Sequence, residues 1–334
     1  MKDVKCSSPV LGQIRGLQHS RVLGTFRQVN DPARNGLYLE DAGRQAADAC
    51  YSGLVLRIPI YLAWLGAVAA GCGILFFLAN RAVYYPHKYP GGAWDVQAEL
   101  GASDVWMDTL DGVRLHGWWV PREDSQLVTL FLHGNAGNVT GRAAHIREIT
   151  SAGSSVLVVD YRGYGKSGGW PTEKGLYQDA ETAFIHLLGM GYRAQQIILH
   201  GESLGSAVAV DLAYRRPCAA LILEAPFTSA SDVAGTVLPV VGPMLVQSYN
   251  SVSKIRWNVR PKLFIQGDRD EIVPLRLGQE LFAAAQGPKS FWVIAGAKHN
   301  DILEAAGAEY RQRLQSFYVS IFRPMPFRMV PFRR

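Results

Sequence analysis

The sequence predicts an α/β fold with a mainly parallel, doubly wound sheet. One transmembrane helix is expected before it in the chain. Three observations support this prediction. Short apolar runs alternate with helix-like segments over most of the chain, which is the pattern of a parallel sheet covered by helices. A Gly-x-Ser-x-Gly sequence follows one of these runs directly. A charge-free apolar stretch, 58–79, lies ahead of all of them.

The expected strands begin with a hairpin. Residues 105–109 and 113–120 flank Asp111-Gly112, a dipeptide typical of tight turns between antiparallel strands. Strands and helices alternate after it, so chemistry is expected at the carboxyl ends of the strands. The later strands are expected at 127–132, 155–160, 196–200, 219–223, 262–266 and 290–294, and the helices near 141–152, 175–189, 203–215, 275–286 and 301–320.

The sequence Gly201-Glu202-Ser203-Leu204-Gly205 lies between an expected strand and an expected helix. In this context it is typical of a nucleophile elbow, a strained turn that lifts the serine Oγ clear of the sheet. The two glycines are needed because larger side chains would collide with the neighbouring strand and helix. Ser203 is therefore the candidate nucleophile. The alternative is a glycine-rich turn with an incidental serine.

A serine hydroxyl is a weak nucleophile at neutral pH and needs a base that a third group orients. His299 is the one histidine downstream of Ser203, and it follows an expected strand. Asp270 lies between them in a turn, where a carboxylate can orient the imidazole. Asp268 in the same turn and Glu224 after an earlier strand are competing acids. The other histidines precede the serine and are interpreted as structural.

Acyl transfer also needs hydrogen-bond donors aimed at the developing oxyanion. The backbone N–H of Leu204, the residue after the nucleophile, is one expected donor. The N–H of Asn135, in the loop after 127–132, is the other, and Gly134 beside it lets the backbone approach a ligand closely. Asn135 as an ordinary turn residue is the alternative.

Together these motifs resemble the α/β-hydrolase superfamily. More narrowly, residues 84–320 resemble the small membrane-anchored serine hydrolases that include depalmitoylating thioesterases and lysophospholipases. The resemblance implies an α/β-hydrolase fold in which Ser203, Asp270 and His299 cleave carboxylic ester or thioester bonds through an acyl-enzyme. The motifs that carry it are His133-Gly134-Asn135-Ala136-Gly137-Asn138, Asp160-Tyr161-Arg162-Gly163-Tyr164-Gly165, Gly201-Glu202-Ser203-Leu204-Gly205, Glu224-Ala225-Pro226-Phe227, Asp270 before Val273-Pro274, and His299-Asn300.

The stretch 58–79 lies between Arg57 and Arg81. As a helix it would be roughly 33 Å long, enough for a hydrocarbon core of about 30 Å. The fold needs no such helix before its first strand, so we expect an uncleaved single-pass anchor rather than a core helix or a cleaved signal peptide. The positive charges of the preceding tail favour a topology with the hydrolase domain outside the cytoplasm.

The remaining segments and the composition limit the possible functions. Residues 1–57 lack periodicity and are expected to be a largely disordered tail, whereas 321–334 form a basic, proline-rich tail. The net charge of +6 lies partly in these tails without a recognition motif, so nucleic-acid binding is not expected. No Cys/His cluster has metal-ligand spacing, and neither a metal nor a cofactor is expected.

A small insertion between Glu224 and Lys262 is large enough to cover the site. Its apolar side chains, among them Phe227 and Met244, suit a pocket for an acyl chain, and core packing is the alternative. The expected partners are therefore an acyl ester or thioester substrate and a membrane that presents it. A serine peptidase of the same fold and a non-catalytic binding protein are the competing functions.

Overall fold

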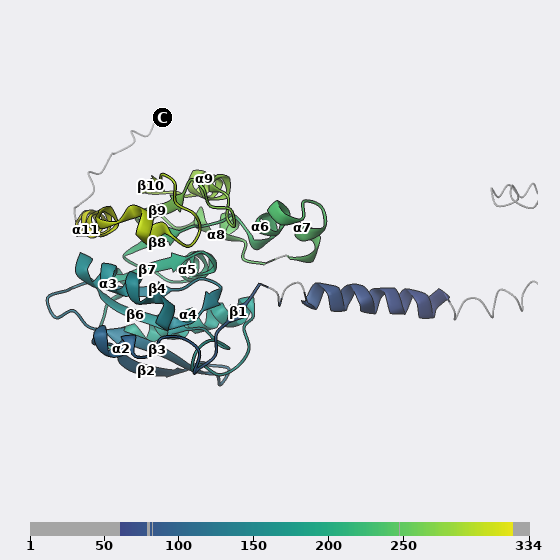
Figure 1. Ribbon diagram of the computed structural model, residues 1–334, viewed down its shortest axis with the longest axis horizontal. Helices are drawn as coiled ribbons and strands as arrows, with labels where there is room; N and C mark the ends of the chain where they lie inside the picture. Colours follow the sequence, from purple (N-terminus) through teal and green to yellow (C-terminus); the bar gives the residue numbers. More distant parts are fainter. Residues whose placement is uncertain (1–60, 79–80, 82, 247, 323–334) are drawn as a thin grey trace, which may run out of the picture. The chain divides into compact units, whose positions relative to one another are not determined.

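The structure is a computed structural model that describes residues 61–78, 81, 83–246 and 248–322 (Figure 1). The expected tail 1–57 lies outside the described residues, as do the ends of the expected anchor and nearly all of 321–334. The chain divides into two units, Met1–Val68 and Ala69–Arg334, and the sheet lies in the second.

The helix Tyr61–Leu78 consists of exposed residues with a mean hydropathy of 2.0. By length and composition it is the one helix among the described residues that can cross a membrane. A helix suits that role because all of its central backbone groups bond within the helix and need no water. The helix is compatible with the expected anchor, while its insertion and its topology stay predictions.

An eight-stranded sheet forms the centre of the second unit, with the order β10-β9-β8-β7-β4-β6-β3-β2, which can be followed from top to bottom in Figure 1. The pairs β2–β3 and β3–β6 are antiparallel, and every other neighbouring pair is parallel. The predicted mainly parallel sheet is therefore confirmed. Its strands are β2 (Ser103–Asp108), β3 (Arg114–Val120), β4 (Val128–Leu132), β6 (Ser155–Asp160), β7 (Ile197–Glu202), β8 (Ala220–Glu224), β9 (Lys262–Gly267) and β10 (Lys289–Ile294).

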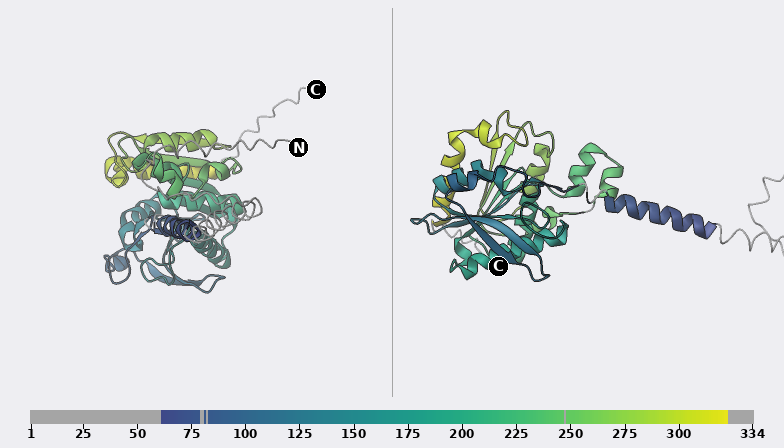
Figure 2. Two further views of the ribbon diagram at one scale, coloured as in Figure 1. Left: turned by 90° about the vertical axis from the view of Figure 1, so that its right-hand side faces the viewer. Right: turned by 60° about the horizontal axis from the view of Figure 1, so that its bottom comes forward.

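Helices cover both faces of the sheet, as a doubly wound fold requires (Figure 2). The alternation of β4 shows why: Leu130 and Leu132 belong to one buried cluster, with α4, α5, α8 and α9, whereas Phe131 belongs to the other, with α3 and α11. The helices are α2 (Val96–Glu99), α3 (Ala143–Ala152), α4 (Glu173–Gly189), α5 (Leu204–Arg215), α6 (Ala230–Val237), α7 (Val241–Leu245), α8 (Ser251–Ile255), α9 (Leu275–Ala284), α10 (Ile302–Ala306) and α11 (Ala308–Phe322).

The expected helix 301–320 is two helices in the structure. Gly307 separates α10 from α11 and has a φ of 54°, a left-handed value that interrupts a right-handed helix. The prediction of one continuous helix was wrong because an isolated glycine inside a helical pattern does not by itself reveal its backbone conformation.

The winding of the chain reverses between β4 and β7. From β4 the chain continues to β6 on one side, and from β7 it continues through β8, β9 and β10 on the other. Ligands of open α/β sheets bind outside the carboxyl ends of the strands at such a switch point. The loop after β4, which contains β5 (Ala136–Gly137), and the turn after β7 therefore meet where a site is expected. The insertion between β8 and β9 carries α6, α7 and α8.

Candidate active site

Ser203 occupies a strained turn between β7 and α5. Its φ of 51° and ψ of −115° are unfavourable for any residue with a Cβ. The turn fits because both flanking glycines lack a side chain: a Cβ on Gly201 would lie 2.2 Å from the oxygen of Gly205, and one on Gly205 would lie 1.9 Å from the oxygen of Leu132. The N–H of Ser203 donates to the carbonyl of Glu224 at 2.8 Å, which fixes the turn to β8.

The structure brings Ser203, His299 and Asp270 together. His299 Nε2 lies 3.0 Å from Ser203 Oγ, and His299 Nδ1 lies 2.8 Å from Asp270 Oδ2. The other carboxylate oxygen of Asp270 accepts the N–H groups of Ile272 and Val273 at 3.0 and 2.7 Å. The carboxylate is thus held in place, so it can orient the imidazole toward the hydroxyl.

The two competing acids bond to other groups. Asp268 Oδ1 accepts the N–H of Gly296 at 2.6 Å. Glu224 is buried, where it accepts hydrogen bonds from His145, His200 and Tyr310. Burial alone would raise the pKa of Glu224, but the attraction of His145 and His200 outweighs it and holds that pKa well below its usual range. Glu224 is therefore an anion whose carboxylate oxygens bond to His145, His200 and Tyr310 rather than to His299.

The two predicted oxyanion donors flank the serine. Leu204 begins α5, and Asn135 lies in the loop after β4. Both residues line one cavity with Ser203, and neither backbone N–H has an acceptor among the residues that the structure describes. Free amides at the start of a helix and in a neighbouring loop can bind a developing negative charge.

An apolar cavity of about 210 Å³, here called the apolar arm, opens beside the serine. Phe227, predicted to contact substrate, lines it. Met244 does not: this side chain is 68% exposed on α7, and α6 supplies the apolar wall instead. Apolar composition alone could not show which helix of the insertion faces the site. The arm is lined by Val83, Asn135, Ser203, Leu204, Phe227, Ala230, Val233, Ala234, Val237, Val246, Ile272 and Val273.

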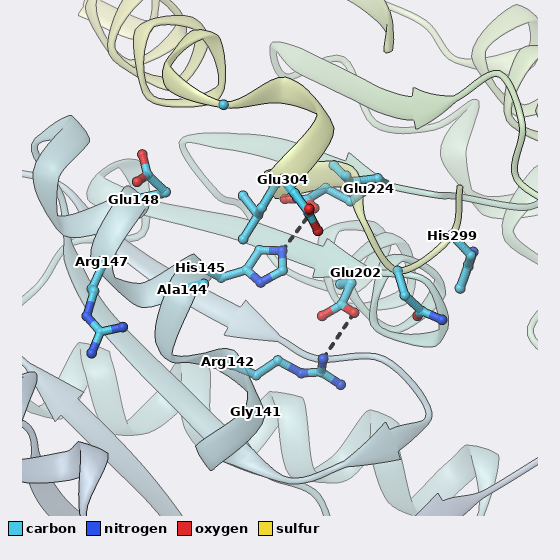
Figure 3. Close-up of a pocket in the computed structure, with 14 residues that line it drawn as sticks. Gly141, Arg142, Ala144, His145, Arg147, Glu148, Glu202, Glu224, His299 and Glu304 are labelled. Atoms are coloured by element: carbon cyan, nitrogen blue, oxygen red, sulfur yellow. Dashed lines mark hydrogen bonds and ion pairs between the residues drawn. The ribbon is translucent and has the colours of Figure 1, made fainter. Parts of the chain in front are cut away.

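A second cavity of about 550 Å³, here called the polar arm, also borders Ser203 and is lined by His299, Asn300, Tyr85 and His87. A neighbouring cavity of about 540 Å³ shares His299, Asn300, Arg142 and Glu202 with it (Figure 3). In Figure 3, Arg142 points toward Glu202, and the two side chains form an ion pair at 3.3 Å. This side of the site is therefore charged and polar.

Two contributions were missed by sequence reasoning. His145 was interpreted as structural, yet it lines the neighbouring cavity while its Nε2 lies 3.2 Å from Glu224. Val83 precedes the expected hydrolase domain, 84–320, and lines the apolar arm. Tyr85, near the start of that domain, lines the polar arm. Neither contribution has a local motif, because both depend on contacts between distant parts of the chain.

Comparisons with known proteins agree with this fold. Residues 123–256 match a family model described as serine aminopeptidase, S33. The chain is 39% identical over 237 residues to an uncharacterised protein of Mycobacterium tuberculosis, covering 69% of this chain and 84% of that protein. It is 33% identical over 275 residues to the alpha/beta hydrolase domain-containing protein WAV2 of Arabidopsis thaliana, covering 73% and 89%. An esterase structure from Pyrococcus furiosus superposes with a TM-score of 0.62 at 20% identity, covering 71% and 98%.

Proposed function

The chain belongs to the α/β-hydrolase superfamily, and on that premise we propose that it is a serine esterase or thioesterase acting on acyl substrates. One observation carries the proposal. The hydrogen-bonded series from Ser203 through His299 to Asp270, with distances of 3.0 and 2.8 Å, is the arrangement that activates a serine hydroxyl.

In the proposed mechanism, Ser203 Oγ attacks the acyl carbonyl while His299 Nε2 takes the hydroxyl proton. Asp270 orients the imidazole and stabilises its charged form. The N–H groups of Asn135 and Leu204 bind the oxyanion. His299 then gives the proton to the leaving alcohol or thiol, which departs. Water enters and attacks the acyl-enzyme while His299 takes its proton. The bond between the acyl carbon and Ser203 Oγ then breaks, His299 returns the proton to Oγ, and the carboxylic acid leaves.

The two arms support a substrate with an apolar acyl chain and a polar leaving group. The leaving group has to lie beside His299, which protonates it, and His299 lines the polar arm. The acyl carbonyl has to lie between the donors Asn135, which lines both arms, and Leu204, which lines the apolar arm. Burial of the chain among aliphatic side chains contributes roughly 0.8 kcal/mol per methylene. An acylated lipid or lipidated protein has this composition.

We further propose that the helix Tyr61–Leu78 anchors the enzyme in a membrane that presents the substrate, with the hydrolase domain outside the cytoplasm. The topology is tested in intact cells with a chain whose four native cysteines are replaced by serine and which carries a single new cysteine on the surface of the hydrolase domain. Labelling by an impermeant thiol reagent is expected. Labelling only after the cells are opened would refute this orientation.

The test of the reaction uses the full chain in lipid nanodiscs with p-nitrophenyl esters and acyl thioesters. Ser203→Ala is expected to lose turnover by several orders of magnitude and to lose labelling by a fluorophosphonate probe. Ser206→Ala is the matched control, because Ser206 is a buried neighbouring serine with no part in the proposed mechanism. Turnover that persists in Ser203→Ala would refute a serine hydrolase. A wild-type chain that neither reacts with the probe nor hydrolyses any ester would indicate a binding protein.

The description of the matched family model favours a second candidate, an aminopeptidase. The free amino group of an aminopeptidase substrate belongs to the acyl side and would have to enter the apolar arm. That arm is lined by Val233, Val237 and similar side chains, with no carboxylate to bind an ammonium group. Acyl esters are therefore favoured. Faster cleavage of aminoacyl p-nitroanilides than of the esters would reverse this order.

A further inference from the structure

The segment of residues 83–88, here called the approach segment, is separated from the helix Tyr61–Leu78 by four residues and lines the cavities beside Ser203. Its strand β1 (Tyr85–Pro86) pairs in parallel with β5 in the loop that carries Asn135. The two strands form a small sheet of their own, separate from the central one. The approach segment thus pairs with the loop after β4, which carries Asn135, rather than with the eight-stranded sheet.

Asn135 is held at three points, two of them by the approach segment. The N–H of Tyr85 donates to the carbonyl oxygen of Asn135 at 3.0 Å, and the side-chain amide of Asn135 donates to the carbonyl of Val83 at 3.0 Å. The hydroxyl of Tyr164 donates to the same Asn135 oxygen at 2.8 Å. With its carbonyl and its side chain both fixed, Asn135 cannot turn freely, so its N–H keeps one direction.

The approach segment is also fixed to the insertion that lines the apolar arm. The hydroxyl of Tyr84 lies 2.8 Å from that of Tyr249, which is buried between α7 and α8. Burial raises the pKa of Tyr84 to about 12, so this hydrogen bond stays between neutral hydroxyls at physiological pH. Further along, the N–H of His87 donates to the carbonyl of Gly137 at 3.0 Å.

The side chains of the approach segment alternate, as in any extended chain. Val83 lines the apolar arm, whereas Tyr85 and His87 line the polar arm. Tyr84, between them, packs against the hydrophobic core. The side chains of Val83, Tyr85 and His87 therefore border the cavities beside Ser203. The side chain of Tyr84 helps to hold the segment in place through its bond to Tyr249.

We propose that the approach segment is a positioning and specificity-determining part of the active site. It aims the N–H of Asn135 at the oxyanion, and through Val83 it limits the acyl chain that fits. This inference rests on the proposed esterase function. Its consequence is that the same short segment that joins the apolar helix to the hydrolase domain also completes the catalytic site.

The first test measures ester turnover by the full chain with Asn135→Ala, which keeps the backbone N–H but loses the bond to Val83. Removal of an entire oxyanion donor costs about 10²–10³ in kcat, so a misdirected donor is expected to lower kcat by about 10–100-fold with KM nearly unchanged. Asn135→Asp, of equal size, places a carboxylate against the Val83 carbonyl and is expected to lose as much. It serves as the second variant if Asn135→Ala does not fold.

The matched control is Asn258→Ala. The amide of Asn258 donates to the carbonyl of Ala213 at 3.0 Å, the same type of bond, but Asn258 lines neither arm. Loss of kcat in the Asn135 variants alone, at equal or smaller loss of melting temperature, supports the inference. Equal kcat in wild type and both Asn135 variants overturns it while the esterase function stands. Absence of wild-type turnover overturns both.

The second test addresses specificity through Val83→Phe. The larger ring is expected to fill part of the apolar arm and to lower kcat/KM for long-chain esters at least tenfold relative to acetyl or butyryl esters. Because Val83 contributes its backbone carbonyl to Asn135, turnover of the shortest ester reports whether the positioning role has been preserved. An unchanged chain-length profile overturns the specificity role.

Discussion

The strained backbone at Ser203 should lower the stability of any variant that keeps a Cβ there, relative to glycine. Its φ of 51° with ψ of −115° burdens any residue that carries a Cβ, whereas glycine adopts such values without that penalty. We compare Ser203→Gly with Ser203→Ala. Both variants lose the hydroxyl and its bond to His299, so they differ only in the Cβ and in the freedom of the backbone.

The expected difference follows from two opposing contributions. Backbone strain of this kind costs about 1–3 kcal/mol, and Ser203→Gly relieves it. Glycine in turn loses roughly 0.5–1 kcal/mol more backbone entropy than alanine on folding. Ser203→Gly is therefore expected to exceed Ser203→Ala in unfolding free energy by up to about 2.5 kcal/mol. For a domain of this size, 1 kcal/mol corresponds to about 2–4 °C in melting temperature.

The assay is thermal unfolding of both full-chain variants in the same detergent, followed by circular dichroism, with urea unfolding as a second measurement. Both variants should be catalytically inactive, so the comparison is independent of substrate. Without strain, the entropy cost of glycine alone would make Ser203→Gly melt about 1–4 °C below Ser203→Ala. That result would show that the turn stores no strain, and the physical account of the elbow would be wrong.

Three further predictions concern packing and buried charge. Gly205→Ala is expected to lower the free energy of unfolding by at least about 1–3 kcal/mol, because its Cβ would lie 1.9 Å from a backbone oxygen. Gly141→Ala has open space around it and should change urea unfolding little. Glu224→Gln should lose about 3 kcal/mol of unfolding free energy, because it breaks a buried ion pair, yet keep kcat within tenfold of wild type. Asp270→Asn should lower kcat by about 10⁴. The reverse pattern would make Glu224 the catalytic acid. Burial lowers the pKa of Lys262 to about 8, so the unfolded chain binds the extra proton between pH 8 and 10.5. The stability of wild type relative to Lys262→Met should therefore rise across that window in urea titrations, and a constant difference would contradict it.

Local motifs explain why much of the site could be predicted. Ser203, Asp270 and His299 each follow an expected strand, and parallel strands bring their carboxyl ends to one edge of the sheet. The structure accordingly brings the three residues together, although their roles await the experiments above. Asn135 could be predicted as an oxyanion donor because it follows a strand in a glycine-containing loop.

Long-range contacts explain the remainder. The pairing of Tyr85 with Ala136 joins segments about fifty residues apart and leaves no periodicity in either. Met244 and the residues of α6 are similarly apolar, so only packing decides which of them face the cavity. The buried cluster around Glu224 depends on side chains from three separate elements, α3, β7 and α11. Sequence patterns report local conformation, whereas these features are properties of tertiary packing.

The catalytic residues and the wall of the apolar arm are supported by different parts of the fold. Leu132 and Gly201 are partners in the β4–β7 ladder, so the turns bearing Asn135 and Ser203 start from a common rigid base. The aliphatic wall of the apolar arm, in contrast, comes from α6. This helix belongs to the insertion between β8 and β9 and takes no part in the β4–β7 pairing. Substitutions within residues 230–246 can therefore change the shape of the apolar arm without altering the strands that position Asn135 and Ser203.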